Sequence, residues 1–273
     1  MTTVLNSIID GVRIDLDVRK QSTSLAELQE RISDLAPALP ASGILQGRQF
    51  SVIAEVKRAS PSKGHLADIP EPAQLAAAYE RGGAQVISVL TEQRRFNGTL
   101  ADLDAVRANV GIPVLRKDFM VDDYQMFEAR AHGADVVLLI VAALDDAQLR
   151  DLNDVALGLG MSVLVEVHDE AELERGLALS PALLGVNARN LKTLDVDLAT
   201  CERLLPLIPQ GVVGVAESGI ATLEDVQRMA TAGARAILVG EALVTNGEPS
   251  ETVRQWSDAG LSIREVTLKD GES

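Results

Sequence analysis

Short runs of aliphatic residues alternate with amphipathic stretches along most of the chain. Within the runs nearly every position is apolar, which is typical of strands buried on both faces of a parallel sheet. Each run is followed by a segment able to form a helix, and this alternation indicates βα units. The eight predicted strands span residues 51–57, 85–90, 113–117, 135–140, 162–167, 183–187, 212–216 and 236–239.

A weak internal repeat favours a closed sheet. A helix end, a glycine, an alanine and the start of a strand recur in that order at Gly82-Gly83-Ala84, His132-Gly133-Ala134 and Ala232-Gly233-Ala234. Glycine is favoured directly after a helix because it adopts the left-handed backbone conformation without strain. Recurrence of one αβ junction predicts a single (β/α)8 TIM barrel rather than an open sheet.

The barrel is expected to span residues 51–260, with a helical extension at 1–50 and a polar, fraying tail at 261–273. Residues 24–33 have apolar side chains at helical spacing, whereas Pro37, Pro40 and Gly43 are expected to break that helix. We expect the extension to pack on one end of the barrel. A disordered tail is the alternative for this segment.

Composition narrows the possible partners. The chain has 273 residues, 47% of them hydrophobic and only 3% aromatic, so one large aliphatic core is expected. Its net charge of −15 argues against binding to nucleic acid or to an anionic membrane. A small anionic phosphosugar in a locally basic pocket remains compatible with that charge.

Few residues are suited to metals or redox chemistry. Cys201 is the single cysteine, and the three histidines at 65, 132 and 168 are too scattered to predict a metal site. We therefore expect no metal site. No signal peptide or membrane-length apolar run is recognisable, so a cytoplasmic protein is expected. The acidic composition is compatible with a monomer or a weak dimer.

Polar side chains gather at the carboxyl ends of the predicted strands, where (β/α)8 barrels carry their active sites. Glu55 and Lys57 lie two residues apart and therefore project from one face of a strand. Each such residue could serve only a rim salt bridge or a loop cap, but their convergence on one end favours a site. The candidates at these ends are Glu55, Lys57, Ser60, Lys117, Phe119, Glu166, Asn187, Arg189, Glu217, Ser218, Gly219, Gly240 and Glu241.

Small residues follow the seventh and eighth strands, at Ser218-Gly219 and at Gly240. The loops after these two strands form the usual phosphate site of such barrels, so a phosphate site is predicted here, with the Ser60 hydroxyl beside it. The lysines and glutamates then indicate acid–base chemistry on a phosphorylated carbon skeleton. For this chemistry we expect a lowered pKa for a lysine crowded by another lysine, and a raised pKa for a glutamate in a partly apolar site.

Six motifs, in order, resemble indole-3-glycerol phosphate synthases over residues 4–256: IAEVKRASPSKG (53–64), LRKDF (115–119), LVEVH (164–168), GVNARNL (185–191), AESGI (216–220) and LVGEAL (238–243). The resemblance implies ring closure of 1-(2-carboxyphenylamino)-1-deoxyribulose 5-phosphate, with loss of carbon dioxide and water, in tryptophan biosynthesis. It implies no cofactor. Ala188 departs from the asparagine of many relatives. No second barrel is expected, and hence no fused phosphoribosylanthranilate isomerase activity.

The resemblance also implies roles for six catalytic residues. Lys117 is implied to be the general acid that protonates the ribulose carbonyl, and Glu166 the base of the dehydration. Lys57 is implied to engage the substrate carboxylate, and the division of proton transfers between the two lysines stays open. Glu55 is implied to orient the lysines. Asn187 and Glu217 are implied to hold substrate hydroxyls.

Substrate-binding residues follow from the same resemblance. The implied phosphate ligands are Ser60, Ser218, Gly219, Gly240 and, through its backbone, Glu241. Arg189 is implied to strengthen the polar network at the rim. The implied apolar sleeve around the anthranilate ring consists of Phe96, Phe119, Leu138, Leu191 and Val239.

Two other functions compete with this one. An isomerase or epimerase of another ribulose phosphate is disfavoured because the metal-dependent epimerases need clustered His and Asp residues. A catalytically inactive barrel that serves as a scaffold is disfavoured because every matched catalytic position is intact.

Overall fold

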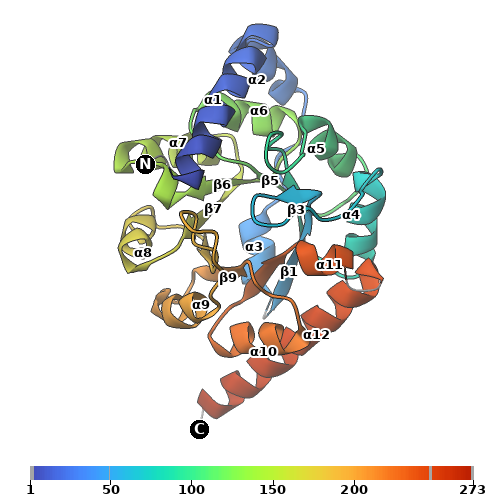
Figure 1. Ribbon diagram of the computed structural model, residues 1–273, viewed down its shortest axis with the longest axis vertical. Coiled ribbons are helices and arrows are strands. Elements are labelled where there is room, and N and C mark those ends of the chain that lie inside the picture. Colours follow the sequence, from blue (N-terminus) through green and yellow to red (C-terminus); the bar gives the residue numbers. More distant parts are fainter. Residues whose placement is uncertain (1–2, 49, 246–247, 272–273) are drawn as a thin grey trace.

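The computed structural model describes residues 3–48, 50–245 and 248–271. At its centre, parallel strands close into a barrel in the order β1-β10-β9-β8-β7-β6-β5-β4 (Figure 1). The strands are β1 (Ser51–Val56), β4 (Val86–Leu90), β5 (Val114–Lys117), β6 (Val136–Ile140), β7 (Ser162–Val167), β8 (Leu183–Asn187), β9 (Val213–Glu217) and β10 (Ala236–Val239). The predicted (β/α)8 barrel is confirmed, and each predicted strand matches an observed one to within one residue at either end.

Helices form the outer layer around the strands (Figure 1). They are α4 (Pro72–Arg81), α5 (Leu100–Arg107), α6 (Tyr124–Ala131), α7 (Asp146–Gly158), α8 (Glu170–Leu177), α9 (Ala199–Leu204), α10 (Leu223–Thr231), α11 (Glu241–Thr245) and α12 (Pro249–Gly271), with short 3₁₀ turns at Val141–Ala143 and Leu205–Leu207. None of the helices in the described ranges is long and apolar enough to cross a membrane.

The repeated αβ junction has one geometry wherever it occurs. In the first copy the N–H of Ala84 donates to the carbonyl of Tyr79 at 3.0 Å, and the N–H of Gly83 donates to that of Glu80 at 2.9 Å. This pair of bonds is a Schellman motif, and it requires the positive φ of 93° found at Gly83. A fourth copy, which the sequence pattern did not reveal, lies at Gly160.

The N-terminal extension closes both mouths of the barrel. It consists of α1 (Val4–Ser22), α2 (Leu25–Ser33) and α3 (Ala41–Gln46), so the expected break occurs around the prolines while Gly43 lies inside a helix. Two fully buried residues of α3, Ala41 and Leu45, pack against interior-facing strand residues such as Val213. Because Ser42 N–H donates to Ser162 Oγ, at the start of β7, α3 covers the amino-terminal mouth.

The C-terminal segment differs from the expectation of a fraying tail. Helix α12 continues through Gly260 to Gly271 and packs against α10, α4 and β1. Its apolar side chains at Val253 and Trp256 are buried, which holds the helix on the outer layer. Residues 1, 2, 49, 272 and 273, which belong to the predicted extension and tail, lie outside the described residues.

The junction glycines give a test of the backbone argument. Gly233 has a φ of 105°, and no described atom lies within 4 Å of the place where a Cβ would project, so Gly233→Ala meets backbone strain alone. We expect a loss of about 1 kcal/mol in unfolding free energy, measured by chemical denaturation.

Gly158→Ala is the matched control because Gly158 lies in α7, lacks a positive φ and has the same open space around its Cα among the described atoms. That change should be neutral or stabilising by up to about 1 kcal/mol. Equal losses for the two variants would contradict the role given to the left-handed conformation.

Candidate active site

Interior-facing positions change from apolar to charged along the strands. On β1 Ile53 belongs to the apolar barrel interior, and two residues later Glu55 projects from the same face. The same step occurs from Leu115 to Lys117 on β5, and it recurs from Leu164 to Glu166 on β7 and from Val215 to Glu217 on β9. The strand period therefore delivers one lysine and three glutamates to the carboxyl-terminal mouth.

Lys117 is the centre of this charged layer. Its Nζ lies 3.3 Å from Glu166 Oε2 and 3.6 Å from Glu217 Oε2. The Lys117 side chain is 15% exposed, whereas the two glutamate side chains are only 1% and 2% exposed. One ammonium group thus bridges two carboxylates that are otherwise withdrawn from water.

The expected lowering of a lysine pKa is wrong for Lys117. Burial disfavours its charge, but the carboxylates of Glu166, Glu217 and Glu55 outweigh burial and raise the pKa above its ordinary value. The expectation assumed a neighbouring lysine as the dominant charge, whereas three carboxylates surround this ammonium. Lys117 is therefore an ammonium group at neutral pH.

The two carboxylates beside Lys117 differ in pKa. Burial works against ionisation of Glu166, yet Lys117 and His168 hold the pKa of this carboxyl below its usual range. Burial and the charge of Glu166 raise the pKa of Glu217 to about 8. The expected raised glutamate pKa is thus found at Glu217 and not at Glu166, because Glu166 also faces an imidazole.

Glu55 and Lys57 form a second charged pair beside the first. Lys57 Nζ lies 3.5 Å from Glu55 Oε1, and Ser88 Oγ donates to Glu55 Oε2 at 3.3 Å. Lys57 Nζ also lies 5.9 Å from the centre of the Phe96 ring, a cation–π distance. Lys57 is therefore placed between the charged layer and an aromatic wall.

Three residues at the ends of β9 and β10 line the cavity, namely Ser218, Gly219 and Gly240. Ser218 and Gly219 have φ values of 67° and 77°, a left-handed turn that can aim successive N–H groups at one anion. Helix α11 begins at Glu241, directly after Gly240, and the first N–H groups of a helix have no intrahelical acceptor. Left-handed turns and helix starts of this kind are typical of phosphate sites.

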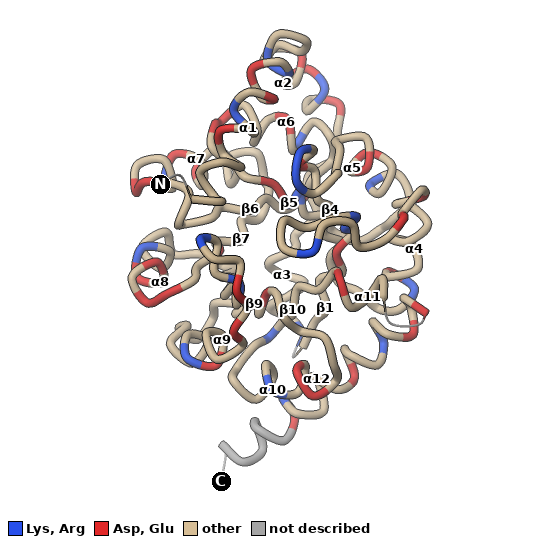
Figure 2. Tube along the Cα trace, in the orientation of Figure 1, with Lys and Arg blue, Asp and Glu red and all other residues tan. Residues whose placement is uncertain are grey.

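Two cations border this end. Figure 2 shows the loop after β1 in front of the barrel strands. Lys63 of this loop forms an ion pair with Glu241. Arg189 Nη1 donates to Ser62 Oγ at 2.9 Å and to the carbonyl of Leu194 at 3.1 Å. The loop is shaped by the short β2 (Ala59–Ser60) and β3 (Gly64–His65) pair.

The opposite end of the cavity is apolar. The Phe96 and Phe119 rings lie 6.1 Å apart at an interplanar angle of 39°. The start of α1 closes this end, since Val4, Leu5 and Ile8 line a small pocket together with both rings. An aromatic group of a ligand would be shielded from water there.

One cavity collects most of the predicted residues. Those lining it are Glu55, Lys57, Phe96, Lys117, Phe119, Leu138, Arg189, Glu217, Ser218, Gly219, Val239, Gly240 and Glu241. Ser60 and Leu191 line the adjoining apolar pocket. Glu166 and Asn187 do not border the cavity itself, and Asn187 lines a polar groove on the far side of the strand ends.

Sequence reasoning missed residues of two kinds. Leu90, Asp118, Ile140, Ile220 and Leu238 also line the cavity, and the positions of Ile140 and Leu238 at strand ends were the available signal. His168 contacts Glu166, whereas the sequence singled it out only as the last residue of a motif. Among the described residues, no group of three or more His, Cys, Asp and Glu side chains is arranged to hold a metal ion.

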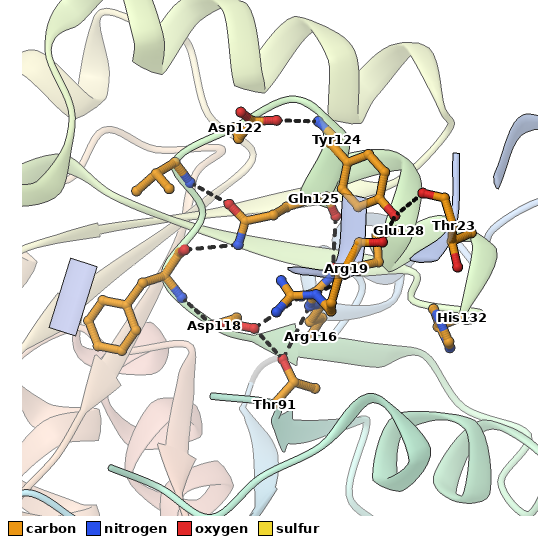
Figure 3. Close-up of polar contacts among 12 residues, drawn as sticks. Arg19, Thr23, Thr91, Arg116, Asp118, Asp122, Tyr124, Gln125, Glu128 and His132 are labelled. Atoms are coloured by element: carbon orange, nitrogen blue, oxygen red, sulfur yellow. Dashed lines mark hydrogen bonds and ion pairs between the residues drawn. The ribbon is translucent and has the colours of Figure 1, made fainter. Parts of the chain in front are cut away.

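A buried polar network fixes the strand that carries Lys117 (Figure 3). Arg116, only 1% exposed, contacts Asp118 Oδ2 at 3.1 Å and Glu128 Oε2 at 2.9 Å. Its Nε donates to Thr91 Oγ1. Glu128 Oε1 also accepts a hydrogen bond from Arg19 Nε of α1 at 2.8 Å. The network therefore connects the N-terminal helix to both sequence neighbours of Lys117.

The fold and the cavity define the chain as a (β/α)8-barrel protein with lysine and glutamate side chains in a cavity at the carboxyl ends of its strands. A family model described as indole-3-glycerol phosphate synthase matches residues 5–256. Indole-3-glycerol phosphate synthase of Nocardioides sp. is 58% identical over 255 residues, covering 93% of this chain and 98% of the relative. The chain belongs to the indole-3-glycerol phosphate synthase family.

A second relative agrees with that family, and a solved structure agrees with the fold. Indole-3-glycerol phosphate synthase 1 of Streptomyces coelicolor is 57% identical over 258 residues, covering 94% of this chain and 96% of the relative. Among solved structures, a thiamine phosphate pyrophosphorylase from Pyrococcus furiosus matches 80% of this chain and 98% of its own with a TM-score of 0.60. At 15% identity the latter shows a shared fold alone.

The network under Lys117 predicts a large stability effect. Glu128→Gln removes the one carboxylate that lies between Arg116 and Arg19, so a buried guanidinium loses its main partner. We expect a loss of about 3 kcal/mol in unfolding free energy, measured by urea denaturation.

Glu202→Gln is the matched control, because Glu202 pairs with Arg228 on the exposed surface. Exposed ion pairs contribute little, so this variant should unfold as the parent does. A Glu128→Gln variant as stable as this control would contradict the importance of the buried pair.

Proposed function

We propose that the chain is an indole-3-glycerol phosphate synthase, a carboxy-lyase of tryptophan biosynthesis. It closes the indole ring of 1-(2-carboxyphenylamino)-1-deoxyribulose 5-phosphate and releases carbon dioxide and water. The observation that carries this proposal is one cavity with Lys117 between a phosphate-suited end and an apolar end. The substrate has the same order of parts: a phosphate, a hydroxylated chain and a benzoate ring.

The two ends of the cavity position the substrate. The N–H groups around Gly219 and Gly240 hold the phosphate, and the Phe96–Phe119 wall takes the ring. A flexible chain held at both ends bends so that the ring carbon approaches the ribulose carbonyl. Such positioning converts an improbable encounter into a favourable intramolecular step.

Lys117 donates the proton for ring closure. Its raised pKa keeps it charged at neutral pH, and the alkoxide that develops on the carbonyl oxygen is a stronger base than the amine. The surrounding carboxylates keep the ammonium in place until that charge develops. Lys117 therefore acts as an electrostatic anchor in the ground state and as an acid in the transition state.

Loss of carbon dioxide is favoured where the carboxylate loses its hydration. Lys57, beside the Phe96 ring, holds the substrate carboxylate at the border of the apolar sleeve. Glu55 fixes Lys57 through their 3.5 Å ion pair. As the carboxylate leaves, its charge passes into the new ring system, which the sleeve shields from water.

Dehydration needs a base and a partner for the leaving hydroxyl. Glu166, kept ionised by Lys117 and His168, is the base, and Asn187 and the protonated Glu217 hold the hydroxyls. Glu166 lies behind Lys117, so the lysine must shift for the carboxylate to reach the substrate proton that it removes.

The ligand is a small phosphosugar, and we propose a cytoplasmic, monomeric or weakly dimeric enzyme that uses no cofactor.

The reaction is tested by following indole-3-glycerol phosphate fluorescence from the synthetic substrate. Wild type should turn over, and Lys117→Ala should lower kcat by roughly 100- to 10,000-fold because the positioned acid is lost. Lys20→Ala, at an exposed ion pair of α1, is the matched control and should keep full activity. A folded wild type without turnover, or an active Lys117→Ala, would refute the proposal.

The phosphate end is tested by two glycine variants. Gly219→Ala strains a φ of 77° and sets a methyl group 2.5 Å from Val196 Cγ1, so the N–H groups of this turn move. We expect KM to rise roughly 10- to 100-fold, as for lost hydrogen bonds to a charged group, and inhibition by inorganic phosphate to weaken in parallel.

Gly211→Ala is the control for backbone strain, because Gly211 has a φ of 94°, lies away from the cavity and has open space around it among the described atoms. Its KM should equal that of the wild type although its stability falls. Equal KM changes in the two variants would place the phosphate elsewhere.

A further inference from the structure

His168 joins the catalytic layer to the outer helices. It follows β7 directly, and its side chain is only 11% exposed. Nε2 lies 3.3 Å from Glu166 Oε1, an ion-pair distance without the alignment of a hydrogen bond. Nδ1 lies 2.8 Å from Glu172 Oε2, so one ring bridges two carboxylates.

The start of α8 fixes this ring. Asp169 caps the helix by accepting the N–H of Glu172 at 2.9 Å, and Glu172 turns back to accept the N–H of His168 at 2.9 Å. The same carboxylate oxygen accepts both the backbone and the ring nitrogen. The sequence His-Asp-Glu-Ala-Glu at 168–172 thus orients the imidazole through a helix cap.

The two carboxylates that share Lys117 have unequal surroundings. Glu166 faces Lys117 on one side and His168 on the other. Glu217 contacts Lys117 at 3.6 Å, and within the described part of the chain its Oε1 is buried without a hydrogen-bond partner. Two facing carboxyl groups in such unequal environments take different protonation states and hence different roles.

We propose that His168 is a positioning residue that, as an imidazolium held by Glu172, keeps Glu166 ionised as the base and leaves the proton of the pair on Glu217. This inference rests on the proposed function, because it assigns roles within that reaction. The proton count balances: Glu166 takes the proton that dehydration removes from the substrate and passes it to the leaving hydroxyl, which departs as water. Lys117 regains from solvent the proton that it gave to the carbonyl oxygen, and His168 keeps both of its ring protons.

The charges around the ring support this state. Burial opposes the charge on His168, but Glu166 and Glu172 raise its pKa to about 10. The groove beside it exposes the ring edge to water. The other charged side chains lining that groove are Asp169 and Arg175 of α8, Lys192, Asp195 and Asp197 of the loop after β8, and Arg203 of α9.

The first test is the pH dependence of kcat. His168→Gln keeps a hydrogen-bond donor but removes the cation, so the Glu166 carboxyl should gain its proton at higher pH. We expect the acid limb of the kcat profile to move up by about one pH unit, with kcat at the acid end about tenfold lower and KM changed less than threefold. Turnover at the alkaline end should approach that of the wild type.

His132→Gln is the matched control, since His132 also pairs with a carboxylate, Asp104 at 2.7 Å, but lies away from Glu166. Its profile should match that of the wild type. A His168→Gln profile that coincides with the control, or an equal fall in kcat at every pH, would overturn the proposal.

The second test needs no turnover. The chain has only three histidines, so ¹⁵N NMR of the imidazoles gives three resolvable rings, with His168 assigned as the signal lost in His168→Gln. It should stay doubly protonated at pH 8 in the wild type, and Glu172→Gln should make it lose its proton at lower pH. If His168→Gln does not fold, the variants His65→Gln and His132→Gln identify the other two signals. The remaining signal then belongs to His168.

A neutral His168 ring at pH 7 would overturn the inference even if the enzyme makes indole-3-glycerol phosphate. If the His168 ring is charged but the folded protein shows no turnover, the protonation state is supported and the proposed function is refuted. The two failures are therefore distinguishable.

Discussion

The site depends on one arrangement of buried groups: the Lys117 ammonium beside the carboxyl groups of Glu166, Glu217 and Glu55. Taking these groups out of water is costly, and each is tolerable only because the others are present. The same low exposure strengthens every interaction among them. A buried layer of this kind does not improve stability over an apolar core, so its presence marks a place where the molecule is built for chemistry.

The rest of the barrel holds that layer rigidly. Arg116 and its partner Asp118 hold the strand on either side of Lys117, and Glu128 ties Arg116 to the N-terminal helix (Figure 3). That helix also closes the apolar end of the cavity through Leu5 and Ile8. The helix that covers the site and the strand that carries Lys117 are therefore connected through the same buried ion pairs. A change in these ion pairs should alter the position of both.

Much of this arrangement could be predicted from the sequence. Unbroken aliphatic runs indicated the eight strands, and polar residues at the carboxyl ends of those strands indicated Glu55, Lys117 and Glu217. The protonation states could not be obtained this way. They depend on which charges meet across the barrel, and the pairing of Lys117 with three carboxylates is a property of strand order and register.

Other differences have equally physical causes. Helix α3 forms across Gly43 because Ala41 and Leu45 are buried in the barrel mouth, a tertiary gain that outweighs a glycine's weak helix propensity. Helix α12 extends beyond Gly260, where the polar composition predicted fraying. The placement of His168 was also invisible, because a histidine after a strand has no distinctive pattern until a helix cap orients it.

The most direct test of the account is a crystal structure with an unreactive, reduced analogue of the proposed substrate. The account predicts the phosphate on the N–H groups around Gly219 and Gly240, the ring between Phe96 and Phe119, and the reduced carbonyl oxygen beside Lys117 Nζ. An analogue bound with its phosphate away from the ends of β9 and β10, or with Lys117 remote from that oxygen, would contradict it.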